Sequence, residues 1–343
     1  MSRTLTPEQI DVSQRLILNA ENIVVTTHKH PDGDAIGSAL AMHHFLKSIG
    51  KNPKTILPDP APDFLHWVTE YGYCIIAEEK PELTEDTIKS ADLIFSLDYN
   101  SLSRTGDFVS KLLQQSTAPF ILIDHHQQPG EYPVVCYSDT SACSTCEMVY
   151  RFIEQCGWRG HLNLDIATCI YLGIMTDSGS FRYHTVSADT HRIAGELISA
   201  GLDHAEIHRS VYDTNLMDKL KLIGFALSEK LVVLPDHSTA FISLTQEELQ
   251  RYNYRQGDTE GLVNQALSIR GIKMAAFFRE GNNEIKISFR SKGTFDVNSF
   301  SRMHWQGGGH INAAGGLSNE NMNSTLEKFR ELVSQFSNQI VAS

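Results

Sequence analysis

Two short apolar runs in this chain of 343 residues end in dense clusters of aspartate and histidine. Residues 23–25 lead into Thr26-Thr27-His28-Lys29-His30-Pro31-Asp32-Gly33-Asp34, and residues 120–123 lead into Asp124-His125-His126. Apolar runs of this length and β-branched composition are typical of buried strands. Ligands bind at the carboxyl ends of the strands in an open α/β sheet. The pattern therefore predicts such a sheet, with polar side chains gathered at one edge.

Helical and strand patterns alternate along the first half of the chain. Thr6-Pro7-Glu8-Gln9 predicts the capped start of a helix, and residues 35–49 have a helical pattern closed by Gly50. Strands are expected over residues 23–27, 54–57, 93–97 and 120–123. We therefore expect an α/β fold whose N-terminal sheet is mainly parallel and carries helices on both faces.

The pattern changes beyond residue 185. Helices are expected over residues 191–200, 204–212 and 216–231. Strands then follow, with a closing helix, over residues 232–234, 239–244, 273–278, 284–289 and 325–336. We predict an N-terminal domain over 1–185, a helical linker over 186–230 and a smaller C-terminal α/β domain over 231–343.

Composition narrows the function classes. The net charge of −12 argues against a partner such as long nucleic acid, because that binding depends on many lysine and arginine contacts to phosphates. The sequence has no apolar stretch of membrane-spanning length and no signal-peptide core, so we expect a cytoplasmic protein with no membrane contact. A chain kept in the cytoplasm has reduced thiols, so the six cysteines predict no disulfide framework. Cys143 and Cys146 have zinc or redox spacing, but the absence of a second pair favours buried thiols at a helix start.

Acidic residues recur at the ends of the apolar segments. Asp98 follows residues 93–97, Asp124 follows residues 120–123, and Asp177 ends the apolar segment 169–177. We expect all three at the carboxyl ends of strands, at the same sheet edge as the first loop. A single such aspartate is more often a helix cap, and a lone histidine is usually structural, as we expect for His43 and His44. His30 is either a group that supports the ligands from outside or a solvated loop residue. Together with the first loop, however, these residues exceed what one metal ion needs. Two ions roughly 3.5–4 Å apart that share a carboxylate would use them all, and imidazole with carboxylate suits manganese, iron or cobalt.

A second constellation lies near the C-terminus, in Gly307-Gly308-Gly309-His310 followed by Ala313-Ala314-Gly315-Gly316. Three glycines free the backbone to wrap an anion with its amide groups, and His310 can add a donor. Arg290, at the end of a predicted strand, can clamp a phosphate with its guanidinium. The structural alternatives are a flexible turn for the glycines and a surface position for Arg290.

In this order the motifs resemble the DHH phosphoesterase superfamily, in the branch with a C-terminal DHHA1 domain. The resemblance implies two metal ions bound by six residues, with Asp98 bridging them: His28, Asp32, Asp34, Asp98, His125 and Asp177. It further implies that His126 faces the substrate phosphate and that Asp124 orients the histidines. Substrate contacts would come from Arg290, Gly308, Gly309 and His310 of the second domain, with Arg104 and Arg182 as further candidates.

The resemblance also implies an activity. Compact two-domain members of this branch hydrolyse phosphoester bonds of short nucleotides, such as 3′-phosphoadenosine 5′-phosphate (pAp) and oligoribonucleotides of two to five nucleotides. A hydroxide held by two metal ions would attack in line, in a cleft between the domains. We expect Mn²⁺, with Mg²⁺ or Co²⁺ as alternatives, a short nucleotide as partner, and a homodimer as an open possibility. Other readings are a linear or cyclic dinucleotide (c-di-AMP, pApA) phosphodiesterase, a general single-strand exonuclease, and an inactive nucleotide-binding regulator.

Overall fold

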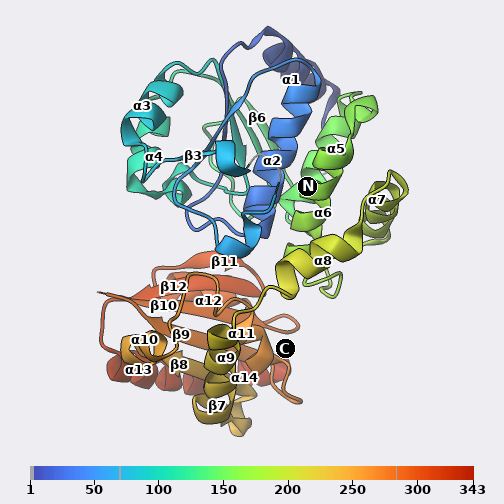
Figure 1. Cartoon of the computed structure of the whole chain (residues 1–343). Coiled ribbons are helices and arrows are strands. Elements are labelled where there is room, and N and C mark those ends of the chain that lie inside the picture. Colours follow the sequence, from blue (N-terminus) through green and yellow to red (C-terminus); the bar gives the residue numbers. More distant parts are fainter. Residues whose placement is uncertain (1–3, 69–70, 283) are drawn as a thin grey trace. The chain divides into compact units, whose positions relative to one another are not determined.

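The computed structural model describes residues 4–68, 71–282 and 284–343. The chain divides into two compact units, Met1–Thr214 and Asn215–Ser343. Each unit has its own six-stranded sheet and its own hydrophobic core (Figure 1). Helices α7 (Ala188–Ser199) and α8 (His204–Tyr212) belong to the first unit, whereas α9 (Met217–Glu229) belongs to the second. The segment predicted as a helical linker therefore contains the boundary between the units.

The first unit is built on a parallel sheet with the strand order β3-β2-β1-β4-β5-β6. Every neighbouring pair in it is parallel. The strands are β1 (Ile23–Thr26), β2 (Lys54–Leu57), β3 (Ile75–Ile76), β4 (Leu93–Leu97), β5 (Phe120–Asp124) and β6 (Val135–Ser138). The predicted fold class is confirmed. The strand order reverses between β1 and β4, and a reversal of this kind opens a crevice at the carboxyl ends of the strands.

Helices cover both faces of this sheet (Figure 1). Successive strand residues point to opposite faces, so Val25 packs in the core beneath α2 (Gly33–Ser48), whereas Val24 packs in the core beneath α3 (Pro81–Lys89) and α4 (Gly106–Gln115). Helices α5 (Thr145–Gln155) and α6 (Leu164–Asp177) pack beside α2. The first helix, α1 (Pro7–Asn19), begins at the predicted capping box of Thr6 and Gln9.

Asp177 does not lie at the end of a strand, as the sequence pattern predicted. The segment 169–177 belongs to α6, so Asp177 ends a helix instead of following a strand. Residues 169–175 are all buried, because α6 packs against α2 and α5. A helix buried on all sides gives an unbroken apolar run, which periodicity alone cannot separate from a buried strand.

The second unit contains a mixed sheet with the order β11-β12-β10-β9-β8-β7. Only β8 and β9 run parallel, and the other pairs are antiparallel. The strands are β7 (Leu231–Leu234), β8 (Thr239–Leu244), β9 (Met274–Glu280), β10 (Ile285–Ser291), β11 (Gly308–His310) and β12 (Ala313–Ser318). The sequence suggested a loop or turn for the glycine run at residues 307–309, but Gly308–His310 form a short strand at the edge of this sheet.

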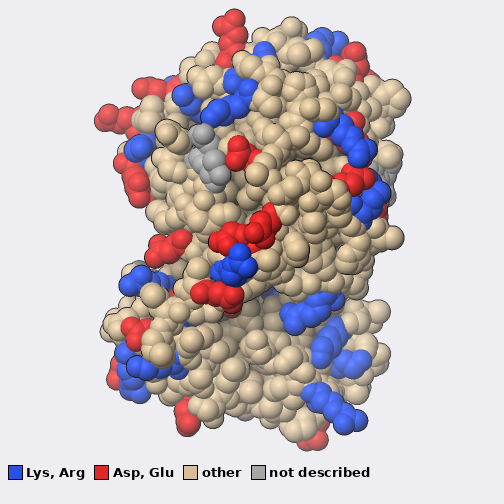
Figure 2. Space-filling view, turned by 45° about the vertical axis from the view of Figure 1, so that its right-hand side comes forward, with Lys and Arg blue, Asp and Glu red and all other residues tan. Residues whose placement is uncertain are grey.

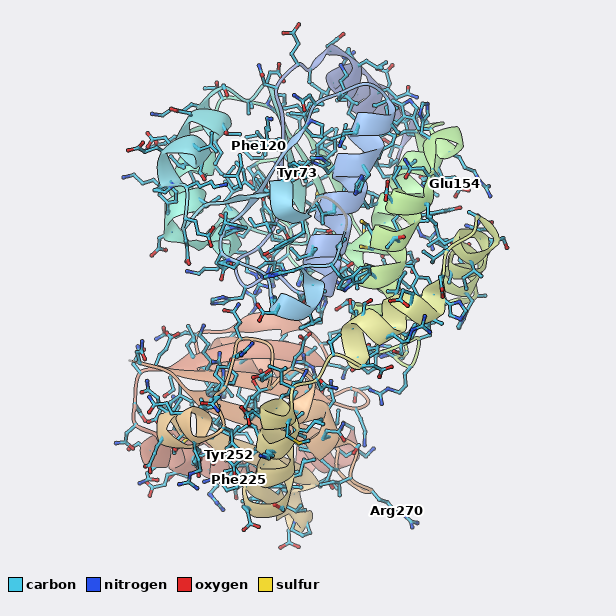
Figure 3. The ribbon with its side chains drawn as sticks, viewed as in Figure 1. Tyr73, Phe120, Glu154, Phe225, Tyr252 and Arg270 are labelled. Carbon is cyan, nitrogen blue, oxygen red and sulfur yellow. The ribbon has the colours of Figure 1, made fainter. Side chains whose placement is uncertain are left out.

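Two cores also flank the second sheet. Trp305 and Phe329 lie in a core with residues of α12 (Val297–His304), α13 (Met322–Gln335) and α14 (Ser337–Ala342). The opposite core contains residues of α9, α10 (Gln246–Arg251) and α11 (Leu262–Leu267). Phe225 and Tyr252 lie together against this second core, with ring centroids 5.3 Å apart (Figure 3). Each unit thus has the layered packing of an α/β domain.

The structure also bears on the expectations about membrane spans and cysteines. No helix in the described ranges is long and apolar enough to cross a bilayer. All six cysteines are free thiols, and Cys143 and Cys146 are buried where α5 begins, as predicted. On the face shown in Figure 2, lysine and arginine side chains lie among acidic ones in the upper part, and several lie together with few acidic neighbours at the lower right.

Candidate metal centre

The loop between β1 and α2 positions the first candidate ligands. His28 follows the buried strand, and its Nδ1 lies 2.9 Å from the carbonyl oxygen of Lys29. That contact leaves Nε2 pointing to Asp98, 3.4 Å from Oδ2. Asp32 caps α2, because one carboxylate oxygen accepts the backbone N–H groups of Asp34 and Ala35. A histidine whose Nδ1 is held by a carbonyl presents Nε2 to a metal in a fixed orientation.

Two further contacts hold this loop, and sequence reasoning missed both. The buried Asp59, just beyond β2, accepts the backbone N–H of His30 at 2.6 Å and pairs with its Nδ1 at 2.5 Å. His30 has a φ of 57°, a left-handed conformation that needs such support. On the other side, the N–H of Lys29 donates to the carbonyl of Arg104 at 2.8 Å. The only available signal for Asp59 was its place after a strand at the same sheet edge.

The start of α5 holds two central carboxylates. Asp34 is 1% exposed and accepts the backbone N–H groups of Thr145 at 2.6 Å and Cys146 at 2.9 Å. The hydroxyl of Thr145 donates to Oδ1 of Asp98 at 2.8 Å. A helix N-terminus favours a carboxylate because its first N–H groups are unpaired and its dipole is positive there. Thr145 therefore fixes both acidic groups, a role that its position in the sequence did not reveal.

The triplet after β5 completes the cluster. Nε2 of His125 lies 3.5 Å from a carboxylate oxygen of Asp98, 3.5 Å from one of Asp177 and 3.7 Å from one of Asp34. His126 places Nδ1 2.7 Å from Oδ1 of Asp124. The other oxygen of Asp124 is buried without a hydrogen-bond partner among the described residues. Asp124 therefore orients His126 directly, while His125 faces the three carboxylates.

These side chains form two separate sets whose candidate ligand atoms lie within 4.8 Å of one another. One set is His28, Asp32 and Asp98, and the other is Asp34, His125 and Asp177. A third set joins Asp98, Asp124 and His126. The structure thus brings together the six residues expected as ligands, and their binding of metal stays a prediction.

The charge balance of the cluster fits bound cations. Burial, with the neighbouring Asp98 and Asp177, raises the pKa of Asp34 well above its usual value. Burial likewise raises the pKa of Asp177 to about 6. Burial lowers the pKa of His125, but the three carboxylates around it outweigh burial and raise that pKa to about 9. A buried cluster of this kind holds protons that a divalent cation would displace, and its nitrogen and oxygen donors suit Mn²⁺.

Two predicted substrate-contact residues of the first unit are exposed. Arg104 lies in the short 3₁₀ helix Leu102–Thr105. Burial lowers the pKa of His28, but the hydrogen bond to Asp98 and the charges of Asp32 and Asp98 raise that pKa overall, and the nearby charge of Arg104 opposes the rise. Arg182 lies just after α6, with its guanidinium carbon 5.6 Å from the ring centroid of Tyr183. The turn before it has three consecutive residues with positive φ, Gly179, Ser180 and Phe181. Each arginine follows a cluster residue within a few positions, Asp98 before Arg104 and Asp177 before Arg182, and their contact with substrate stays a prediction.

The predicted substrate residues of the second unit gather at one end of its sheet. Arg290 of β10 and His310 of β11 are both paired in register with Ala313 of β12, one on each side. Gly309 has a φ of 152°, and a Cβ there would lie 2.4 Å from the carbonyl oxygen of Ala313. Its N–H donates to the side-chain oxygen of Asn298 at 2.9 Å. Glycine is therefore required at position 309 by both conformation and space.

The fold and the cluster of aspartate and histidine side chains agree with a known class of protein. Residues 22–174 match the DHH family, N-terminal domain, and residues 240–340 match the DHHA1 domain. The chain is 30% identical over 307 residues to the bifunctional oligoribonuclease and PAP phosphatase NrnA of Bacillus subtilis (strain 168), covering 88% of this chain and 90% of that relative. The chain belongs to the DHH family and is a phosphoesterase of that family with a DHHA1 domain.

Two further similarities extend over most of the chain. NrnA of Thermus thermophilus is 28% identical over 323 residues, which cover 91% of this chain and 89% of that relative. The crystal structure of an exopolyphosphatase-related protein from Bacteroides fragilis matches with a TM-score of 0.93 at 36% identity, covering 99% of each chain. The resemblance stated from the motifs is thereby confirmed.

Proposed function

We propose that this phosphoesterase hydrolyses short nucleotides with terminal phosphates, such as pAp and oligoribonucleotides of two to five nucleotides. The observation that carries the proposal is the buried cluster in which His28 and His125 turn Nε2 toward the carboxylates of Asp34, Asp98 and Asp177, with Asp32 beside them. Similarity to relatives named as oligoribonucleases and PAP phosphatases supports the substrate class.

We propose two divalent cations at this cluster, preferably Mn²⁺. One would be held by His28, Asp32 and Asp98, and the other by Asp34, His125 and Asp177, with Asp98 shared. Such ions supply a hydroxide nucleophile at neutral pH and neutralise charge on the phosphate. The fit rests on the donor set and on the second oxygen of Asp124, which is buried without a hydrogen-bond partner among the described residues.

His126 is the residue we assign to the substrate phosphate. Oδ1 of Asp124 holds Nδ1 of His126, so the imidazole ring has a fixed orientation beside the cluster. In the second unit, the backbone of Gly308 and Gly309 with the side chains of Arg290 and His310 would bind another phosphate of the same nucleotide. The acidic net charge agrees with a short substrate, since long strands need many basic contacts.

The test is hydrolysis by the purified full chain with Mn²⁺, comparing pAp, the dinucleotide pApA, c-di-AMP and an RNA of about 20 nucleotides, a length beyond the reach of a few phosphate contacts. We expect turnover of pAp and pApA and little of the long RNA. Asp98→Asn and His125→Ala should lose activity, whereas His161→Ala, at an exposed position outside the cluster, should keep it.

Other outcomes replace the proposal. Progressive degradation of the long RNA would identify a general exonuclease, and turnover of c-di-AMP alone would identify a cyclic dinucleotide phosphodiesterase. Silence on all substrates with bound nucleotide would identify a regulator. Full activity in both cluster variants would show that the site is wrong.

A further inference from the structure

An arginine that the motifs did not single out lies against the glycine strand β11. Arg302 is on α12, and its Nε donates to the side-chain oxygen of Asn298 at 3.0 Å. A Cβ at position 308 would lie 3.5 Å from Nη2 of Arg302, so the guanidinium borders the bare backbone of Gly308. Any larger side chain at position 308 would cover part of the guanidinium. The absence of a side chain there keeps the guanidinium accessible beside the strand.

Asn298 fixes the arginine to this strand. The same Asn298 oxygen that accepts Nε of Arg302 also accepts the N–H of Gly309 at 2.9 Å. Asn298 is 2% exposed, and its own N–H donates to the capping carboxylate of Asp296 at 2.9 Å. One buried oxygen therefore sets the distance between the guanidinium and the glycine backbone. A ligand that binds this backbone would meet the arginine in a prepared orientation.

The charge of Arg302 is unbalanced. Its side chain is exposed, and no carboxylate pairs with it among the residues described. By contrast, Arg192 and Arg209 of the first unit both pair with acidic neighbours. A guanidinium has five N–H donors, and Nε uses only one here. The two terminal nitrogens are left to form the paired hydrogen bonds by which arginine recognises phosphate.

We infer that Arg302 is a substrate-binding residue that recognises a terminal phosphate of a nucleotide beside Gly308. This inference rests on the proposed function and deepens it by naming a residue that distinguishes phosphorylated ends from bare ones. Arg302 makes the enzyme prefer a dinucleotide with a 5′-phosphate over the same dinucleotide without it. Arg290 and His310 lie on β10 and β11 at the same end of the sheet, so Arg302 would add a third cationic or donor group to the phosphate contacts proposed there.

The experiment compares pApA with ApA on the wild-type chain and on Arg302→Gln. In the wild type, kcat/KM is higher for pApA. Arg302→Gln lowers kcat/KM for pApA about tenfold or more, the size expected for a lost charge-assisted pair, and leaves ApA unchanged. Arg302→Lys keeps the charge without the planar fork and gives an intermediate preference. Arg270→Gln is the matched control, because Arg270 is an exposed arginine of the same unit that points away from the ribbon (Figure 3).

Equilibrium binding of pApA and ApA without metal gives a readout that does not depend on turnover. The same loss of preference is expected there. Equal effects of Arg302→Gln on both dinucleotides, or an unchanged preference with an unchanged melting temperature, would overturn the inference while leaving the proposed function intact. If the wild type hydrolyses neither dinucleotide, the proposed function fails, and the binding preference still decides the role of Arg302.

Discussion

Thr145 is the residue through which the helix α5 acts on the candidate metal centre. Its hydroxyl donates to Asp98 and its N–H donates to Asp34. Thr145→Val keeps the backbone N–H and removes the hydroxyl, so one oxygen of the buried Asp98 loses its donor. We expect Mn²⁺ affinity to fall about 10- to 100-fold, as for other residues that orient metal ligands. Titration calorimetry with Mn²⁺ measures this fall directly.

Two variants check that prediction. Thr145→Ser restores the hydroxyl and should recover most of the affinity. Thr87→Val, which removes an exposed hydroxyl on α3, should leave Mn²⁺ affinity unchanged. Wild-type affinity in Thr145→Val would show that the hydroxyl does not position Asp98.

Asp59 supports the ligand loop from the side of β2. Its carboxylate holds both the N–H and Nδ1 of His30, between His28 and Asp32. In Asp59→Ala the left-handed His30 loses both contacts, and the loop can leave the geometry that points His28 and Asp32 to one place. We expect the Mn²⁺ concentration for half-maximal activity to rise about tenfold or more, with a smaller rise in Asp59→Asn, which keeps one acceptor.

The rise in the half-maximal Mn²⁺ concentration must be larger in Asp59→Ala than in a variant that changes only the stability of this connection. Asp63→Ala, which removes a carboxylate from the same connection between β2 and β3, is the comparison. If both variants raise the half-maximal Mn²⁺ concentration equally, Asp59 has no special part in holding the loop.

Sequence reasoning found the residues that follow strands and missed those that act across the fold. Asp98 and His125 could be located because they close apolar runs, and the carboxyl ends of parallel strands share one edge. Thr145 and Asn298 could not, because their contacts join elements whose proximity depends on tertiary packing. A threonine near a helix start has the same local pattern whether or not its hydroxyl reaches a distant carboxylate.

At the scale of elements, the strand β11 depends on Gly309. A methyl group there meets the carbonyl of Ala313 at 2.4 Å, and φ of 152° is unfavourable for any L-residue with a side chain. We expect Gly309→Ala to lower the free energy of unfolding of the second unit by about 1–3 kcal/mol. Gly224→Ala, on the exposed side of α9 with open space around it, should instead stabilise by about 0.5–1 kcal/mol. Chemical denaturation measures both, and a neutral Gly309→Ala would contradict the geometry.

The anchoring of α7 to α5 should weaken in acid. A hydrogen bond from Arg192, with Arg151 nearby, lowers the pKa of Asp189. Because the folded pKa lies below the unfolded value of about 3.9, this stabilisation is fully present above that value and is lost as pH falls through the folded pKa. We expect Asp189→Asn to lower the melting temperature at pH 7, with a difference from wild type that narrows toward pH 3.

The control for this pH dependence is Asp11→Asn, which removes an exposed ion pair with Arg15 and should change the melting temperature little. A difference between Asp189→Asn and wild type that stays constant from pH 7 to pH 3 would show that the charge of Asp189 does not stabilise the fold.

Elements were predictable where pattern and local chemistry agree. Strands β2, β4 and β8 and helix α8 have the bounds expected from the sequence. Strands β11 and β12 were not predicted from the sequence, because their glycines and alanines lack the branched side chains by which strands are recognised. Helix α6 was obscured for the opposite reason, since burial on every side removed the polar face of its pattern.

For the molecule as a whole, the proposed metal-binding residues and the proposed phosphate-binding residues lie in separate units. The first unit gathers the acidic and histidine groups at the point where its strand order reverses. The second unit offers glycine backbone with Arg290, Arg302 and His310 at one end of its own sheet. This division was predictable because the metal motifs and the glycine motif lie in different halves of the sequence.

Anomalous diffraction from a crystal grown with Mn²⁺ would locate the bound ions themselves. We expect two manganese peaks in the first unit, roughly 3.5–4 Å apart, with Asp98 between them. His28 and Asp32 would contact one peak, and Asp34, His125 and Asp177 the other. A single peak, or two peaks with no contact to Asp98, would contradict the two-metal site.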